Sequence, residues 1–179
     1  MNVIDHKLFI LSGYRTILMQ GDDQGKLQTL LEKCADYSLL VAGFPPKPSA
    51  AVSLLADYPP GKTLADKFVI GFSTEQYRLF GVLDAVRDYP RQGDWWLGLL
   101  LLDPAQRNKG LGKRIVQSFE HWVSEQGARR IFLGFLEENQ KACRFWRTMG
   151  FEIVGRQPVR QFGNLTHVVI TMAHNIFEG

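Results

Sequence analysis

The segment from Trp95 to Gln126 constrains the fold of this chain more than any other. It opens with a continuous apolar run, Trp95 to Leu102, which is typical of a strand buried on both faces near the centre of a sheet. Asp103-Pro104 ends this strand, because proline has no N–H group for the sheet ladder. After a short loop, Gly110 to Gln126 carries a stripe of apolar residues at helical spacing. The sequence therefore predicts a strand, a loop and a helix in direct succession.

Hydrophobic periodicity along the rest of the chain predicts a mixed α/β fold, and a length of 179 residues fits one domain covering 1–179. Further strands are expected at 68–72, 77–86, 130–136, 151–154 and 166–172, with one or two more within 6–19. Further helices are expected over 24–37, over 49–56 and after Asn139, which can cap a helix start. The order predicts an antiparallel meander that leads into a strand, helix, strand, helix unit.

Proline is concentrated in one part of the chain. Five of the eight prolines fall between Pro45 and Pro60. One interpretation is a lid-like loop over a binding site, because long ordered loops often bind ligands. The other is a plain surface connection, and the sequence leaves both open.

Composition argues against several classes of function. The formal net charge of +3 and the pI near 8.9 are too weak to predict a nucleic-acid partner, which needs clustered Lys and Arg. The sequence has no 18-residue apolar stretch and no secretory signal at its start, so no membrane partner is expected. The two cysteines, Cys34 and Cys143, and the four histidines lack metal-ligand spacing. We therefore expect no metal and a reducing, cytoplasmic setting.

The loop from Arg107 to Arg114 has the character of an anion site. N–H groups in the first turn of a helix lack intrahelical partners and favour an anion there. Gly110 and Gly112 allow a large anion to approach, which suits a pyrophosphate. A Walker A loop is excluded because no glycine lies five residues before Gly112, and a dinucleotide loop because a third glycine is missing. The loop also holds four cations, namely Arg107, Lys109, Lys113 and Arg114.

Two motifs resemble one known family. Arg107 to Gly112, with the sequence RNKGLG, is similar to the R-x-x-G-x-G/A signature of the GNAT superfamily of acyl-CoA N-acyltransferases. Asn139 to Phe151 resembles the N-x-x-A segment and the following Y-x-x-x-G-F segment of that family. The likeness extends from about residue 66 to residue 172, and the first 60 residues match less well.

The resemblance implies a GNAT-like fold, in which a central, mostly antiparallel sheet is splayed between its fourth and fifth strands and flanked by helices. It also implies acetyl-CoA as the cosubstrate, without a metal. In the family, the pantetheine arm lies in the splay and pairs with the fourth strand, which would be Leu100 to Leu102 here. The residues expected to contact the cofactor are Leu100, Leu101, Leu102, Arg107, Asn108, Lys109, Gly110, Leu111, Gly112, Lys113, Asn139, Ala142, Phe145 and Trp146.

The implied activity is N-acetyl transfer to a primary amine by direct attack in a ternary complex. The amine must lose a proton before it attacks. Asp84 and Glu137 are the candidate bases because their strand positions can face the cleft, and Glu138 and Asp88 are the alternatives to them. The family tyrosine that protonates the leaving thiolate aligns with Trp146, whose indole is no useful acid, so that water or Tyr89 would take its place. This departure keeps a second hypothesis open, a non-catalytic acyl-CoA-binding or sensing module. The sequence also leaves the acceptor open, which is either a small-molecule amine or a peptide or protein amine. It leaves the oligomeric state open as well, either monomer or homodimer.

Overall fold

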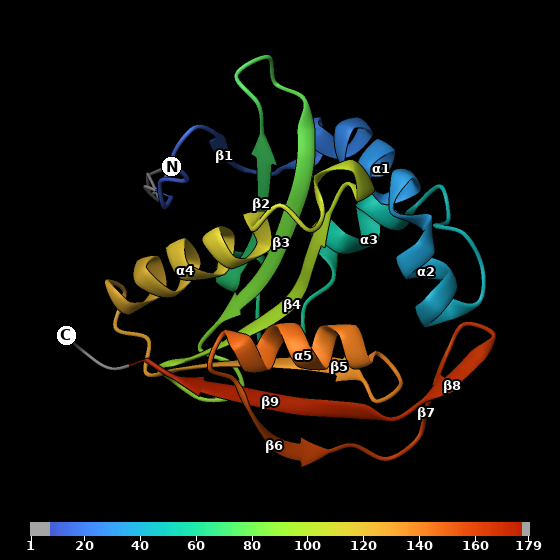
Figure 1. Cartoon of the computed structure of the whole chain (residues 1–179), viewed down its shortest axis with the longest axis vertical. Helices are drawn as coiled ribbons and strands as arrows, with labels where there is room; N and C mark the ends of the chain where they lie inside the picture. Colours follow the sequence, from blue (N-terminus) through green and yellow to red (C-terminus); the bar gives the residue numbers. More distant parts are fainter. Residues whose placement is uncertain (1–7, 177–179) are drawn as a thin grey trace.

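A seven-stranded sheet with helices on both faces makes up most of the computed structural model, which describes residues 8–176 (Figure 1). The strand order is β1-β2-β3-β4-β5-β9-β6, and every neighbouring pair is antiparallel except β4 and β5, which are parallel. The mixed, mostly antiparallel α/β fold predicted from the sequence is confirmed. The strands are β1 (Arg15–Leu18), β2 (Lys67–Ser73), β3 (Leu79–Arg87), β4 (Asp94–Leu102), β5 (Arg130–Leu136), β6 (Glu152–Arg156), β7 (Arg160–Phe162), β8 (Leu165–His167) and β9 (Val169–Asn175).

Helices cover the two faces of the sheet in separate groups. In Figure 1, α4 and α5 lie on one side of the strands, while α1 and α3 lie on the other. Glycines with positive φ mark two helix ends, because Gly43 (φ 77°) follows α2 and Gly110 (φ 76°) precedes α4. The helices are α1 (Gln24–Lys33), α2 (Ala35–Ala42), α3 (Ala50–Ala56), α4 (Leu111–Ser124) and α5 (Gln140–Thr148).

The alternation of side chains along β2 explains why both faces need a cover. Phe68, Ile70 and Phe72 pack into the core beneath α4, whereas Val69 packs into the core beneath α1 and α3. Successive strand residues point to opposite faces, so a strand that is apolar throughout must be covered twice. The run of apolar residues in β4 is continuous because this strand is also covered on both faces. β4 is the central strand of the sheet, as predicted.

Aromatic rings fix α4 against the sheet. Trp122 packs edge-on against Phe68 and Trp95, with ring centroids 5.4 Å apart in both pairs. Phe119 packs edge-on against Trp95 with centroids 6.0 Å apart. Each such pair adds about 0.5–1.5 kcal/mol beyond the burial of its area. These rings hold the C-terminal half of α4 against β2 and β4, and Leu111 and Ile115 bury its N-terminal half in the same core.

A bulge in β4 coincides with the point where β4 separates from β5. Asp84 pairs with Leu99 and Ala85 pairs with Leu97, so Gly98 is an extra residue on β4. The parallel pairing of β4 with β5 ends at the same point, at Leu97 and Leu133. Beyond it the two strands have no register with each other, and the splay predicted between the fourth and fifth strands is present.

The structure differs from the sequence prediction near the N-terminus. The single helix expected over 24–37 is two helices, because Cys34 (φ −94°, ψ 30°) interrupts it between α1 and α2. Cys34 is buried and its Sγ–H donates to the carbonyl of Leu102, which holds this point against β4. The expected strand within 6–19 is confined to β1, and residues 6 and 7 lie outside the described residues.

The C-terminal strands also differ from the prediction. The strand expected over 166–172 is divided into β8 and β9, and β8 forms a hairpin with β7 that the sequence did not indicate. This hairpin packs on the end of α2, since Asn164 N–H donates to the carbonyl of Ala42 at 2.9 Å. Within residues 8–176, no helix combines the length and the apolarity needed to cross a membrane.

An ion pair at the closed end of the splay gives a first prediction. The carboxylate of Asp94 at the start of β4 accepts from Nε and Nη2 of Arg130 at the start of β5, at 3.0 and 3.2 Å, and its side chain is only 3 % exposed. Losing the partner of a buried polar group costs about 1–3 kcal/mol. Because Arg130 is 40 % exposed and water can solvate it when Asp94 is removed, we expect Asp94→Ala to lower the free energy of unfolding by an amount near the lower end of this range. Urea denaturation measures this loss.

Glu125→Ala is the matched control for this prediction. Glu125 pairs with His121 at 3.6 Å, and both side chains are mostly exposed. Removing such a pair should change the free energy of unfolding by less than about 0.5 kcal/mol. Equal losses in the two variants would show that the Asp94 to Arg130 pair does not anchor the strands.

Candidate active site

The predicted cofactor residues converge on one cavity of about 550 Å³, here called the loop cavity. It lies between the splayed end of β4, the loop before α4 and the helix α5. All the predicted cofactor-binding residues line it except Lys109, which is exposed, and Leu111, which is buried in the core. Five further residues line it that the sequence analysis did not name, which are Asp36, Tyr37, Leu40, Lys141 and Thr148.

Main-chain N–H groups are available along one wall of the loop cavity. The first helical hydrogen bond of α4 runs from the N–H of Arg114 to the carbonyl of Gly110 at 3.2 Å. Within residues 8–176, the six N–H groups before it, at 108–113, have no acceptor. Positive φ angles at Asn108 (59°) and Gly110 (76°) curl this backbone, and successive N–H groups in such a turn form an anion-binding concavity.

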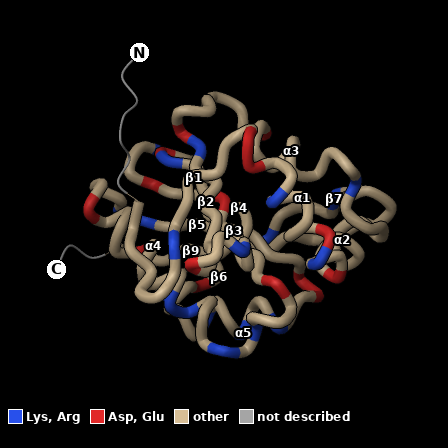
Figure 2. The backbone as a smooth tube through the Cα atoms, turned by 90° about the horizontal axis from the view of Figure 1, so that it is seen from above, with Lys and Arg blue, Asp and Glu red and all other residues tan. Residues whose placement is uncertain are grey.

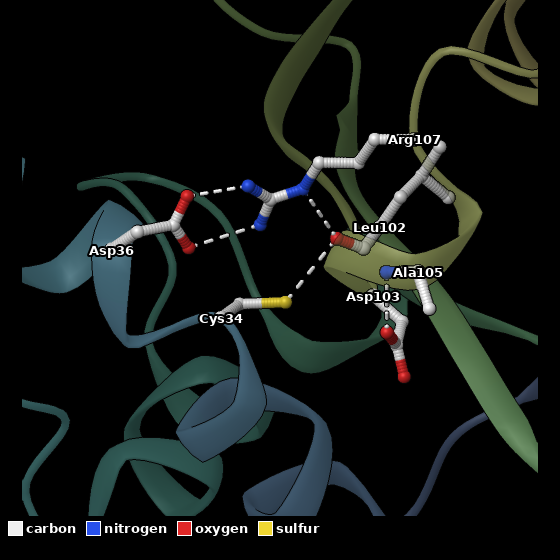
Figure 3. Close-up of polar contacts among 6 residues, drawn as sticks. All are labelled: Cys34, Asp36, Leu102, Asp103, Ala105 and Arg107. Atoms are coloured by element: carbon white, nitrogen blue, oxygen red, sulfur yellow. Dashed lines mark hydrogen bonds and ion pairs between the residues drawn. The ribbon is translucent and has the colours of Figure 1, made fainter.

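Arg107 serves as a structural link in this loop (Figure 3). Its Nη1 and Nη2 form a bidentate ion pair with Asp36 on α2, with 3.0 Å between Nη2 and Oδ1. Its Nε donates to the carbonyl of Leu102 at 2.9 Å, the same oxygen that accepts from Cys34. The Arg107 guanidinium holds the pKa of Asp36 below its usual range, and Asp36 raises the pKa of Arg107. The signature arginine therefore ties α2 to the loop.

Of the other cations near the loop cavity, some contact protein groups and others form no ion pair within the described residues. Arg114 donates from Nη2 to the carbonyl of Ser12 at 2.6 Å and lies 5.6 Å from the ring centre of Tyr14. Lys113 and Lys141 line the loop cavity, and neither forms an ion pair with any residue in 8–176. Lys141 was missed from the sequence, although it lies inside the N-x-x-A segment that marks α5.

Two motif residues shape the cavity through packing and capping. A Cβ at Gly112 would come within 3.3 Å of the Phe145 ring, so glycine there lets α4 and α5 approach each other. Asn139 caps α5, because its Oδ1 accepts from the N–H of Ala142 at 3.1 Å. Trp146 is buried and packs edge-on against Phe145, with centroids 4.8 Å apart.

A second cavity of about 400 Å³, here called the α2 cavity, adjoins the first. Tyr37 and Leu101 line both cavities. Most other lining side chains of the α2 cavity are apolar, and its lysines and carboxylates are Lys47, Lys67, Asp57 and Asp84. The cavity lies where the chain from α2 to α3 passes over β3 and β4, so part of the proline-rich segment contributes to its wall.

Asp84 forms a shielded ion pair in the α2 cavity. Its Oδ1 lies 2.7 Å from Nζ of Lys67, and the two side chains are 13 % and 4 % exposed. Burial raises the pKa of Asp84, against the opposing effect of Lys67. The bulge residue Gly98 lies beside it, since a Cβ there would come within 3.0 Å of Asp84 Oδ2.

The other acid and base candidates lie outside both cavities. Glu137 accepts from Nε and Nη2 of Arg156 at 2.8 and 2.9 Å on the surface, and Arg156 lowers the pKa of Glu137. Tyr89 packs edge-on against Trp96 with centroids 6.0 Å apart. Neither Glu137 nor Tyr89 lines the loop cavity or the α2 cavity, because a strand-end position alone does not determine which way a side chain points.

Comparison with known proteins decides the family. The model of the acetyltransferase (GNAT) family matches residues 28–151. This chain belongs to the GNAT acetyltransferase family. The match begins at residue 28, well before the start near residue 66 that the two motifs indicated, so it takes in α2 and α3 as well as the strand, loop and helix unit.

Individual relatives are distant. The spermine/spermidine N(1)-acetyltransferase of Bacillus subtilis is 26% identical over 80 residues, which is 44% of this chain and 53% of that protein, so the match spans about half of the relative's length. The crystal structure of an acetyltransferase from Thermus thermophilus has a TM-score of 0.73 at 20% identity, covering 92% of this chain and 98% of the other. An aminoglycoside 6'-N-acetyltransferase complexed with coenzyme A has a TM-score of 0.63 at 18% identity, with 92% and 98% covered.

The exposed amides before α4 give a second prediction, for coenzyme A as the ligand. Gly110→Glu would place a carboxylate beside the N–H groups that we expect to hold the diphosphate. Losing two or more charge-assisted hydrogen bonds, at about 1.5–3 kcal/mol each, should weaken the affinity about 100-fold or more. Isothermal calorimetry with coenzyme A measures the change.

Gly127→Glu is the matched control at the other end of α4. Gly110 (φ +76°) and Gly127 (φ +79°) have the same left-handed backbone, and a Cβ at either would meet nothing within 4 Å. Both variants carry a similar strain of about 1–2 kcal/mol and the same added charge. Equal coenzyme A affinities in the two variants would remove the loop from the binding site.

Proposed function

We propose that this chain is an N-acetyltransferase that moves an acetyl group from acetyl-CoA to a primary amine by direct attack in a ternary complex. The observation that carries the proposal is the pair of cavities that meet at Tyr37 and Leu101. One is bordered by free amides and lysines, and the other holds a shielded carboxylate. Two sites with a shared wall allow both substrates to bind together, which direct transfer requires.

The loop cavity fits a long ligand with a diphosphate and an amide-containing arm. The free N–H groups at 108–113 and the side chains of Lys113 and Lys141 would hold the phosphates. Residues 98–102 of β4 have no partner in β5, so their main chain would pair with the arm. Acetyl-CoA, the cosubstrate of the GNAT acetyltransferases, has these groups and would supply the activated acetyl.

The chemistry follows from the placement of Asp84. The acceptor nitrogen attacks the thioester carbon, a C–N bond forms, and the C–S bond breaks. We propose that Asp84 takes the proton that the amine loses, directly or through water, because its raised pKa makes it a stronger base than an exposed aspartate. An N–H group on the unpaired edge of β4 would stabilise the charge on the carbonyl oxygen during attack.

The α2 cavity favours a compact acceptor. A volume of about 400 Å³ and an apolar wall suit a small primary amine with one apolar body. The Bacillus subtilis relative acts, by its name, on spermine and spermidine. A polyamine needs several free carboxylates, whereas here Asp84 is paired with Lys67, and Asp57 is the one other carboxylate among the lining residues.

Both cysteines are free thiols, which suits a reducing compartment such as the cytoplasm.

A panel of amines tests the proposed function. We expect free thiol to be released from acetyl-CoA fastest with alkyl or arylalkyl primary amines, and more slowly with spermidine or a peptide N-terminus. A chromogenic thiol reagent follows the release, and mass spectrometry identifies the acetylated product. Tight coenzyme A binding with no release above the blank for any amine would instead support the acyl-CoA-binding module that Trp146 keeps open.

Two carboxylate variants test the assignment of the base. Asp84→Asn should lower kcat/KM about 100-fold or more and remove the rise in rate with pH. That rise should lie above the ordinary aspartate range, because the folded-state pKa is raised and the base form exists only above it. Glu137→Gln is the matched control, since Glu137 lines neither cavity. A larger loss in Glu137→Gln than in Asp84→Asn would reverse the assignment.

A further inference from the structure

Tyr37 lies where the two cavities meet, a position that no other polar side chain in the described residues shares. Within residues 8–176, Tyr37 and Leu101 are the residues that line both the loop cavity and the α2 cavity, and Leu101 has no polar side-chain group. The Tyr37 hydroxyl has no hydrogen-bond partner among these residues. The residue is 39 % exposed and lines both cavities. Its O–H group is therefore available to a ligand at the junction.

The fold holds Tyr37 in this position through its neighbours in sequence. Cys34 is buried and donates to the carbonyl of Leu102, while Asp36 forms the bidentate pair with Arg107 (Figure 3). The N–H of Tyr37 donates to the carbonyl of Cys34 at 3.0 Å. The first turn of α2 is thus fastened to the end of β4 and to the loop before α4. The break between α1 and α2 at Cys34 is what brings Tyr37 to β4.

The reaction needs a proton donor that α5 does not supply. Trp146 takes the place of the family tyrosine, and it is buried between Phe145 and Phe151, with centroid distances of 4.8 and 5.3 Å. An indole N–H is not acidic enough to protonate sulfur. A neighbouring O–H donor that protonates the departing sulfur would neutralise the charge that develops on it.

We propose that Tyr37, on α2, is the catalytic acid that protonates the leaving sulfur. It would perform the role that Trp146, on α5, cannot perform. The inference rests on the proposed function. As the C–S bond breaks, its electron pair goes to sulfur, and sulfur takes the proton from the Tyr37 oxygen. The phenolate then regains a proton from water. The amine proton goes separately to Asp84, which then releases it to water, so that the phenol and the carboxylate both return to their starting states and protons and charges balance.

The environment of Tyr37 agrees with this role. Desolvation by the surrounding protein raises the pKa of Tyr37 above its ordinary value, so the phenol stays protonated at neutral pH and has a proton to give. No charged side chain contributes to this shift. The donor is therefore still present after Asp84 has ionised, up to the raised pKa of the phenol.

The test uses the full-length chain, acetyl-CoA and the fastest amine of the panel. Tyr37→Phe should lower kcat about 100-fold, with coenzyme A affinity in calorimetry unchanged within about twofold. A site-specific fluorinated tyrosine at position 37, whose phenol loses its proton at lower pH, should restore most of the rate. It should also move the alkaline fall of kcat to lower pH, which a purely structural role of the ring would not do. Tyr58→Phe is the matched control, because Tyr58 is 46 % exposed and lines neither cavity.

Each outcome separates the inference from the proposed function. Wild-type turnover with a Tyr37→Phe rate within twofold of it overturns the role of Tyr37 and leaves the acetyltransferase intact. A reduced rate whose alkaline limb does not move with the fluorinated residue also overturns it, in favour of a positioning role. Absence of wild-type turnover for every amine overturns the proposed function itself.

Discussion

The separation of β4 from β5 is the constraint on which the rest of the site depends. Pairing between the strands stops at Leu97 and Leu133. The next residue of β4, Gly98, forms a bulge against β3. A sheet with continuous pairing would have no free main chain at its centre. At the paired end, Trp95 of β4 packs against Trp122 of α4, and Asp94 of β4 forms an ion pair with Arg130 of β5. The rigid parts of the fold therefore allow one strand edge to stay unpaired.

The end of β4 has a second role, as an anchor for α2. The carbonyl of Leu102 accepts from both Cys34 and Arg107, and Arg107 also holds Asp36. These contacts join the walls of the loop cavity and the α2 cavity at one main-chain oxygen. Basic and acidic residues are interleaved along the backbone in Figure 2, and the pair of Arg107 with Asp36 is one local contact between the two kinds.

The sequence predicted the fold, and it placed a loop between β4 and α4, because these signals are local. The apolar run of β4, the helix stop at Gly127 and the Asn139 cap each depend on neighbouring residues, and all are present in the structure. The role of Arg107 was not predictable, because its partner Asp36 lies 71 residues away in the sequence. The break at Cys34 was missed for the same reason, since helical spacing continues across it. Glu137 illustrates the limit of strand-end reasoning, as its orientation depends on Arg156.

The acid and base assignments share one physical cause. Desolvation raises the pKa of Asp84 in the α2 cavity and also that of Tyr37 at the junction of the two cavities. For a carboxylate this makes a stronger base, and for a phenol it preserves the neutral donor. The competent state, with Asp84 ionised and Tyr37 protonated, exists between the two raised pKa values. The same physical effect, desolvation of an ionisable group, would therefore supply both the base and the acid of the transfer, although the sequence carries no tyrosine at the position where the family usually has one.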